Sequence, residues 1–225
     1  VAFVYAGTPA GLSTTGTTLA TPDGTLAGSG LASCDLNGDG NLDPLVGAAW
    51  TPGRSYEGAV FVYYGDGRNL PTTHSVLLRA TVPEWGANFG ASVACGDANG
   101  DGFDDLLVGA PGEETISYQE GAAYFFLGSS TGPVITSTLW MPNPDGTYGG
   151  NFGTTVAAFG DADGDGLADF AVGGPDNGMT GSVGGSAFVY LGSTAGLVVV
   201  PDVRLGNPLN QSSGRFGCAV ASATY

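Results

Sequence analysis

Short runs of apolar residues alternate with glycine-rich and polar segments along the whole chain. The runs have the length and the Val, Phe and Tyr content of β-strands, and no window carries a sustained helical period. Glycine accounts for 41 of the 225 residues, which favours tight turns between short strands. We therefore expect an all-β fold with almost no helix, in a chain long enough to bury a full core.

The strand pattern recurs three times in the same order. The middle block shows it most clearly, with expected strands over 89–93, 105–111, 121–128 and 134–139, here called A to D from the inside outwards. Repeats of this kind are typical of β-propellers, which are built from four-stranded antiparallel blades. We expect one propeller region over residues 1–225, divided into strands C and D of a partial blade (1–27), full blades (28–80, 81–143 and 144–205) and strand A of a further partial blade (206–225).

Between strands A and B of each block, Asp or Asn occupies every second position and Gly lies at the turn. Positions 1, 3, 5 and 9 of the loop offer oxygen side chains, and position 7 would offer its backbone carbonyl. The candidate ligands are Asp35, Asn37, Asp39, Asn41, Asp43, Asp97, Asn99, Asp101, Phe103, Asp105, Asp161, Asp163, Asp165, Leu167 and Asp169. Because Ca²⁺ takes six to eight oxygen ligands in a flexible cage, we predict about three calcium sites.

Other cations and other calcium loops fit this pattern less well. Mg²⁺ demands a strict octahedron, and Zn²⁺ prefers His and Cys, which the ladders lack. An EF-hand needs a bidentate Glu at position 12 followed by a helix, whereas position 12 here is Val46, Val108 or Val172. A single Asp/Asn/Gly cluster is usually an ordinary turn, so the recurrence at matched offsets is what indicates a metal loop.

Two short motifs flank the ladders. Phe89-Gly90 and Phe152-Gly153 precede them, and Gly109-Ala110-Pro111 follows strand B of the middle block. With the ladder between them, these residues resemble the FG-GAP repeat of integrin alpha-subunit propellers. The resemblance covers nearly the whole chain and implies a β-propeller with Ca²⁺ in the A–B loops of one face. It also implies that ligands bind at the opposite face, which the B–C and D–A loops form.

The outer blocks depart from this pattern. The first has Ala27-Gly28 in place of Phe-Gly and Gly47-Ala48-Ala49 in place of Gly-Ala-Pro. The third has Gly173-Gly174-Pro175, and its ladder starts one residue later after the Phe-Gly pair than in the middle block. This extra residue predicts a β-bulge in the third block.

The two ends of the chain carry parts of further blades. Residues 1–7 match a strand C, 17–20 a strand D, and 214–220 a strand A after which Thr224 stands where the ladder would begin. Propellers usually have 4–8 blades and avoid open sheet edges. Three arrangements therefore remain open: terminal strands that meet in one small ring, a homodimer that completes a larger ring, or a fragment of a longer array.

Lys is absent and Arg occurs five times against 21 acidic residues, so the net charge is −16. An acidic surface disfavours nucleic acid and anionic membranes as partners. Ten of the 21 acidic residues are ladder carboxylates, so metal binding itself accounts for much of the acidity. No signal peptide or transmembrane run is present, and the expected millimolar calcium sites favour a secreted or cell-surface setting.

The three cysteines leave the redox state open. Cys34 and Cys95 lie just before the first two ladders, and Cys218 lies in the last expected strand. An odd number leaves at least one free thiol or an intermolecular pairing, and the favoured interpretation is that the cysteines are small buried hydrophobic residues.

Aromatic and Arg side chains, the usual anchors of interfaces, occur in the loops of the face opposite the ladders. We expect Trp50, Arg54, Tyr56 and Tyr118 to contact a ligand, and Trp85 and Tyr148 to pack between blades. The favoured function is an extracellular adhesion or protein-interaction module. The alternatives are a glycan-binding propeller or an accessory domain of a secreted enzyme.

We expect no enzymatic activity and no catalytic residues in this chain. Its one histidine, His74, lies in an expected C–D loop without a recurrent nucleophile and base beside it. The carboxylates that could act as acid and base are already assigned to the ladders.

Overall fold

The computed structural model describes residues 2–5, 7–8, 11–21, 25–51, 56–67, 71–81, 85–114, 118–176, 184–209 and 214–221. These residues form three four-stranded antiparallel sheets and two two-stranded sheets. Among them a short 3₁₀ turn, η1 (Ile135–Ser137), is the one helical element. The expectation of an all-β chain with almost no helix is confirmed.

Each four-stranded sheet is one blade of a β-propeller, and its strands follow one another in chain order. Blade 1 consists of β5 (Ala27–Cys34), β6 (Asp43–Ala48), β7 (Ala59–Val62) and β8 (Val76–Leu78). Blade 2 consists of β9 (Ser92–Gly96), β10 (Asp105–Ala110), β11 (Ala122–Phe126) and β12 (Leu139–Pro142). Blade 3 consists of β13 (Thr155–Ala158), β14 (Phe170–Gly174), β15 (Ser186–Tyr190) and β16 (Val203–Gly206).

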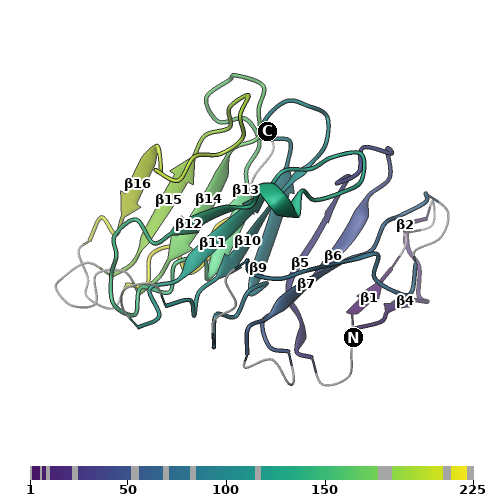
Figure 1. The fold of residues 1–225 in the computed structure, drawn as a ribbon, viewed down its shortest axis with the longest axis horizontal. Coiled ribbons are helices and arrows are strands. Elements are labelled where there is room, and N and C mark those ends of the chain that lie inside the picture. The colour runs from purple at the N-terminus through teal and green to yellow at the C-terminus, as the bar shows by residue number, and fades with distance from the viewer. Residues whose placement is uncertain are drawn as a thin grey trace.

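The blades stand side by side in an open arc, with β16 at one end and β1 at the other (Figure 1). The first strands of neighbouring blades, β5, β9 and β13, contact one another. They therefore form the inner edge of the arc, as strand A does in a propeller.

The N-terminal segment forms a two-stranded sheet within the ranges expected for strands C and D. β1 (Ala2–Val4) pairs with β4 (Thr17–Leu19) in antiparallel register. A small hairpin of β2 (Gly7–Thr8) and β3 (Gly11–Leu12) lies between them and was not expected from the sequence.

The C-terminal segment does not form the expected strand A over 214–220 within the described residues. Phe216 makes an isolated bridge to Gly185, and the Cys218 N–H bonds the Arg215 carbonyl in a turn. Within the described residues, no strand of the same blade pairs with this segment. The described terminal segments join no common sheet, and Thr224 lies outside the described residues.

Two strands of blade 2 begin later than expected. Strand D was expected over 134–139, but the observed strand, β12, begins at Leu139. The shift arises because η1 occupies 135–137, so that pairing with β11 starts at Leu139 opposite Phe125. Strand A, expected over 89–93, is β9 and begins at Ser92. The physical reason in strand A is that Phe89 pairs with Gly58 of the preceding blade rather than with its own.

The Phe-Gly motif is a latch between blades. The Phe89 N–H donates to the Glu57 carbonyl of blade 1 at 2.8 Å, and the buried Phe89 ring packs edge-on against Tyr124. Gly90 has φ 87, which favours glycine, and its carbonyl oxygen lies where a Cβ on Gly47 would be, at 2.1 Å. The glycine of the Gly-Ala-Pro triplet therefore leaves room for the backbone of the next blade.

The latch repeats at the two junctions that follow along the chain. The Phe152 N–H donates to the Glu120 carbonyl at 3.0 Å, and a Cβ on Gly109 would lie 2.0 Å from the Gly153 oxygen. A Cβ on Gly173 would meet the Gly217 oxygen at the same distance, 2.0 Å. The hydrophobic core is accordingly divided into layers between blades, each lined by apolar side chains from two neighbouring sheets.

The extra residue of the third block produces the expected bulge. The Phe159 N–H donates to the Asp169 carbonyl at 3.0 Å, and the Asp169 N–H donates to the Gly160 carbonyl at 2.7 Å, so two residues face one. Blade 1 has a further irregularity in β5, between Ala27 and Leu31, that the sequence did not predict.

Candidate metal centre

The three acidic loops connect the first and second strands of the blades, and each is folded around its first aspartate. In loop 1 (residues 35–43), the Asp35 carboxylate accepts the Asp39 N–H at 3.0 Å and the Gly40 N–H at 2.8 Å. Gly40 has φ 82, so glycine is favoured at this turn. In loop 2 (97–105) and loop 3 (161–169), the Gly102 and Gly166 N–H groups bond the first aspartate at 2.9 Å and 2.8 Å.

The ninth residue closes each loop from a buried position. Asp43 is fully buried and accepts the N–H groups of Leu36 at 3.1 Å and Gly65 at 2.9 Å. Burial raises the pKa of Asp43 to about 6, the two backbone donors oppose this, and the nearby charges of Asp39 and Asp35 add to it. A carboxylate in this environment would be stabilised by a bound cation.

The closing aspartates of the other loops have the same surroundings. Asp105 accepts the N–H groups of Ala98 and Gly128 at 3.0 Å and 2.8 Å, and burial raises its pKa to about 6. The buried Asp169 accepts the corresponding N–H groups of Ala162 and Gly192 at 2.6 Å and 2.9 Å.

The donor atoms of loop 3 fit a single oxygen-coordinated cation. Carboxylate oxygens of Asp161, Asp163 and Asp169 all lie within 4.8 Å of one another. Ca²⁺ binds oxygens at about 2.3–2.6 Å, so one ion between these oxygens could contact all three. Loops 1 and 2 carry Asn37 and Asn99 at the place of Asp163, and their amide oxygens are equally suitable ligands.

Position 7 has a structural role that the ladder pattern did not reveal. The Phe103 ring lies against Gly38 of the preceding loop, where an added Cβ would be 2.6 Å from the ring. Leu167 lies against Gly100 in the same way, at 2.9 Å. The backbone N–H groups of Asn41, Phe103 and Leu167 donate to the aspartate at position 5, and the use of their carbonyls as ligands stays a prediction.

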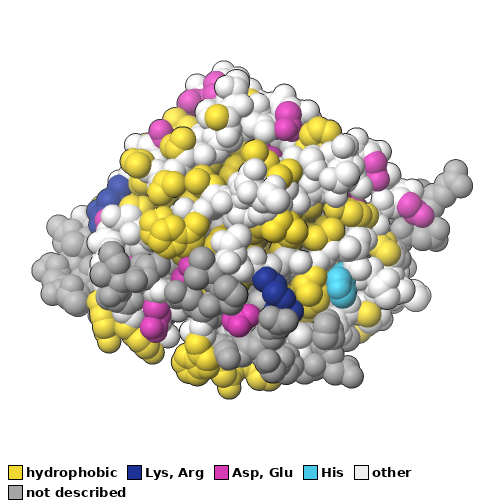
Figure 2. Space-filling model, in the orientation of Figure 1, with side chains coloured by type: hydrophobic (Ala, Val, Ile, Leu, Met, Phe, Trp, Pro, Cys, Tyr) yellow, Lys and Arg dark blue, Asp and Glu magenta, His cyan; other side chains and the backbone are white. Residues whose placement is uncertain are grey.

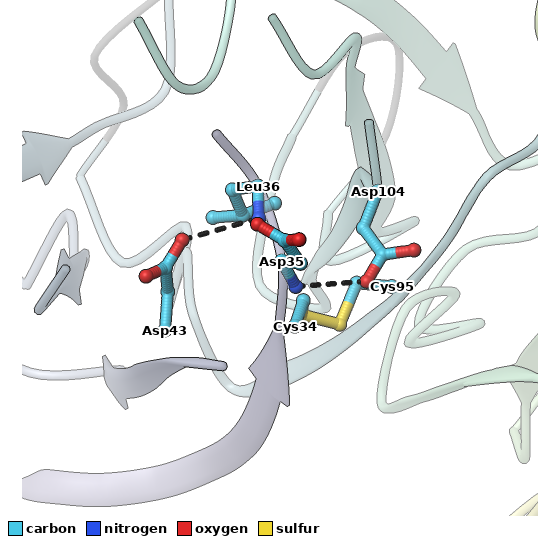
Figure 3. The surroundings of a disulfide bond; sticks show 6 residues. All are labelled: Cys34, Asp35, Leu36, Asp43, Cys95 and Asp104. Atoms are coloured by element: carbon cyan, nitrogen blue, oxygen red, sulfur yellow. Dashed lines mark hydrogen bonds between the residues drawn. A yellow bond between two sulfur atoms is a disulfide. The ribbon is translucent and has the colours of Figure 1, made fainter. Parts of the chain in front are cut away.

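A disulfide joins the strands that lead into loops 1 and 2. Cys34 and Cys95, 61 residues apart in sequence, are bonded across the inner edge of the arc (Figure 3). Cys218 is free and exposed. The sequence left this pairing open, although both cysteines precede a ladder at similar offsets.

Loops 1 and 2 also touch directly through Asp104. Its carboxylate accepts the Asp35 N–H at 2.9 Å (Figure 3). Its own N–H donates to the Asp35 carbonyl at 3.0 Å. Burial raises the pKa of Asp104, and the nearby Asp35 and Asp97 charges add to this effect against the Asp35 backbone donor. Asp104 was not among the predicted ligands, and the signal for it was an aspartate at position 8, where the other loops carry Leu42 and Ala168.

Aromatic side chains gather at the ends of the blades opposite the acidic loops. Tyr56 contacts both Trp50 and Trp85, with ring centroids 5.6 Å and 5.7 Å apart. Tyr118 and Tyr148 form a second pair at 5.6 Å. Figure 2 shows hydrophobic side chains at the surface along the lower border of the view. Three of the four predicted contact residues thus lie in two aromatic clusters, and Arg54 lies outside the described residues.

The expectation that Trp85 and Tyr148 pack between blades is wrong. Trp85 is 71% exposed and Tyr148 is 58% exposed. Each lies four residues before a Phe-Gly latch. Trp85 contacts Tyr56 and Tyr148 contacts Tyr118, which are aromatic residues of the preceding B–C loops. These two residues therefore extend the candidate ligand face.

Sequence reasoning also missed a buried polar group beneath this face. Glu113 is 2% exposed and accepts the Tyr124 hydroxyl at 2.6 Å and the Trp140 indole N–H at 2.9 Å. His74 packs against Phe61, with ring centroids 5.1 Å apart. Both residues therefore contribute to packing or hydrogen bonding within the blades.

The blades, the latch glycines and the acidic A–B loops together define a repeat β-propeller. A family model described as FG-GAP repeat matches residues 89–126. The chain contains an FG-GAP repeat and is an integrin-alpha-like propeller region.

The chain is similar to parts of longer proteins, among them integrin alpha subunits and a phospholipase. The chain is 30% identical over 179 residues to Integrin alpha-4 of Xenopus laevis, covering 79% of this chain and 16% of that protein. It is 34% identical over 160 residues to Integrin alpha-IIb of Mus musculus, covering 68% and 15%. It is 37% identical over 152 residues to Phosphatidylinositol-glycan-specific phospholipase D of Mus musculus, covering 64% and 18%. The chain therefore spans less than a fifth of the length of these relatives.

None of the helical segments in the described part of the chain is long and apolar enough to cross a membrane.

Proposed function

We propose that this chain is a calcium-stabilised propeller region that acts outside the cell as an adhesion or protein-interaction module. The observation that carries the calcium assignment is the loop built three times around an oxygen-only donor set, with three carboxylate oxygens of loop 3 within 4.8 Å. The disulfide supports an oxidising, extracellular setting. Residues 35–43, 97–105 and 161–169 would hold the ions, and each ion would fix the turn between two inner strands.

Calcium would stabilise the fold by mass action. At millimolar free Ca²⁺ and a dissociation constant of about 0.1–1 mM, each site contributes roughly 0.4–1.4 kcal/mol. We expect calorimetry to count about three ions per chain and EDTA to lower the melting temperature. Asp169→Asn, which changes the closing ligand of loop 3, should remove one ion from the count.

A matched control for this variant is Asp202→Asn. Asp202 accepts a backbone N–H, that of Leu191 at 2.8 Å, and lies outside the acidic loops. Its substitution should leave the ion count unchanged. An ion count that Asp169→Asn leaves intact, or a melting temperature indifferent to EDTA, would contradict the calcium assignment.

The interaction surface in this proposal is the aromatic face formed by Trp50, Tyr56, Trp85, Tyr118 and Tyr148. Exposed Trp and Tyr side chains are the commonest anchors of protein interfaces. We expect Trp85→Ala to weaken capture of cells on a surface coated with the calcium-loaded chain, without lowering its melting temperature. Ile135→Ala removes a similarly exposed apolar side chain, 52% accessible, in η1 and serves as the control.

A second candidate function, glycan binding, is favoured by the same aromatic clusters. Clustered rings with centroids 5.6 Å and 5.7 Å apart provide flat apolar faces, and the acidic chain would select neutral glycans. A glycan array probed with the calcium-loaded chain separates the two candidates. Binding to neutral glycans that Trp85→Ala abolishes would favour a lectin, and cell capture without array binding would favour protein adhesion.

We propose that the chain itself has no catalytic role, including where it lies beside a catalytic region as an accessory domain. His74 packs against Phe61, and the buried Glu113 accepts the Tyr124 hydroxyl, so both of these groups are engaged in packing or hydrogen bonds. Calcium-dependent hydrolysis of a phosphatidylinositol-glycan by the isolated chain would overturn this part of the proposal.

A further inference from the structure

The junction between loops 1 and 2 contains side-chain connections that the next junction lacks. Asp104 of loop 2 binds both the N–H and the carbonyl of Asp35, the first residue of loop 1. At the following junction the Ala168 N–H donates to the Asp97 carbonyl at 2.8 Å, which preserves the backbone half of this contact. Ala168 has no carboxylate, so the side-chain half is absent there.

The disulfide strengthens the same junction. Cys34 directly precedes Asp35, and Cys95 lies two residues before Asp97, so the bond ties together the entrances of both loops (Figure 3). By strand register, blade 3 carries Ala158 at the place of Cys95, because Ala158 faces Phe170 as Cys95 faces Leu106. Loop 3 therefore has neither connection to loop 2.

We propose that loops 1 and 2 bind cations as a coupled pair, that Asp104 and the disulfide carry the coupling, and that loop 3 fills independently. The proposal rests on the calcium binding proposed above. Asp104 acts as a positioning residue, since it holds the backbone of a ligand residue and is not itself a member of the donor set.

The coupling follows from shared ordering. Asp104 directly precedes Asp105, the buried residue that closes loop 2. A cation in loop 2 fixes Asp105, which fixes Asp104 and thereby the Asp35 backbone at the start of loop 1. A cation that then enters loop 1 meets a loop whose ordering has already taken place, which raises its affinity.

Each loop contains its own reporter for a direct test. The Gly40, Gly102 and Gly166 N–H groups donate to the first aspartate of their loops at 2.8, 2.9 and 2.8 Å. Their amide resonances can be followed in ¹H–¹⁵N spectra while CaCl₂ is added to the intact, oxidised chain. We expect Gly40 and Gly102 to shift together with one steep midpoint, and Gly166 to shift along a separate, simple binding curve.

Two substitutions and one reduction separate positioning from stability. In Asp104→Ala the Gly40 and Gly102 midpoints should separate by about fivefold or more, the lower range of typical site coupling. Asp104→Asn keeps an oxygen acceptor for the Asp35 N–H and should preserve the common midpoint. Ala168→Ser, at the same position of loop 3, is the control and should leave all three curves unchanged. Reduction of the disulfide in the unmodified chain should also separate the two midpoints, even where Asp104→Ala fails to fold.

The outcomes distinguish this proposal from the one on which it rests. Three glycines that do not shift with calcium would contradict calcium binding itself. Independent Gly40 and Gly102 curves in the unmodified chain would overturn the coupling while leaving calcium binding intact. A single midpoint shared by all three glycines would overturn it too, because the backbone bond common to both junctions would then carry the coupling.

Discussion

Breaking the bond between Cys34 and Cys95 should destabilise the chain through its unfolded state. The cross-link closes a loop across 61 residues of sequence between two inner strands. In the chain-entropy model, a loop of this size removes enough freedom from the unfolded chain to stabilise the fold by about 4 kcal/mol at 25 °C. For a chain of this size, that corresponds to a fall in melting temperature of about 8–16 °C.

The assay is urea unfolding at saturating calcium, with the oxidised and the reduced chain compared side by side. Reduction keeps both sulfur atoms, so the packing of the buried Cys34 changes little. Cys34→Ala with Cys95→Ala is the permanent version, and it should lose slightly more because it also removes buried sulfur. The slope of the unfolding free energy against urea should rise on reduction, since a chain without the cross-link exposes more surface when it unfolds.

Cys218→Ala is the control, because this thiol is free and exposed. It should leave the midpoint unchanged. A loss of less than about 1 kcal/mol on reduction would refute the loop-closure argument, since the model requires several times that value. An equal loss in Cys218→Ala would show that the effect comes from cysteine chemistry in general rather than from this bond.

Two further predictions concern packing. Gly109→Ala should destabilise the chain by about 1–3 kcal/mol or more in urea unfolding, because its Cβ would meet a backbone oxygen of blade 3. Gly206→Ala, where the nearest atom is the end of a flexible Arg side chain at 3.5 Å, should cost little, and equal losses would contradict the latch. Tyr124→Phe should cost about 1–2 kcal/mol because the buried Glu113 loses a hydroxyl donor. Tyr64→Phe, which removes an exposed hydroxyl bond of 3.0 Å, should cost clearly less in the same assay.

The sequence predicted the blades and the acidic loops because both follow from local, repeated patterns. An aspartate at every second position with a glycine at the turn dictates its own hydrogen bonds, and the structure shows those bonds in all three loops. Asp43 and Asp105 begin the second strands of their blades, Asp169 directly precedes the second strand of blade 3, and all three are buried. One copy of either pattern is weak evidence, and its recurrence in three blocks made the prediction specific.

The features that the sequence did not predict depend on contacts between blades. Whether Cys34 meets Cys95 depends on how close two inner strands lie, which no local pattern states. Phe89 was expected in strand A of its own blade. It pairs instead with Gly58 of the preceding blade, and no local pattern predicts such a pairing. Trp85 was expected to be buried, although its exposure is set by a neighbouring loop.

The latch between blades has a consequence for how such chains can grow. One blade recognises the next through a backbone carbonyl and through the absence of a Cβ at Gly47, Gly109 or Gly173, so the joint carries almost no information about which blade follows. A copied blade could therefore form this backbone contact with its original without a compensating substitution at the contact itself. Only additional contacts, such as the Cys34–Cys95 bond, make one junction between blades different from the others. Duplication of blades can therefore lengthen such a chain, whereas the order of the blades depends on the few junctions that carry additional contacts.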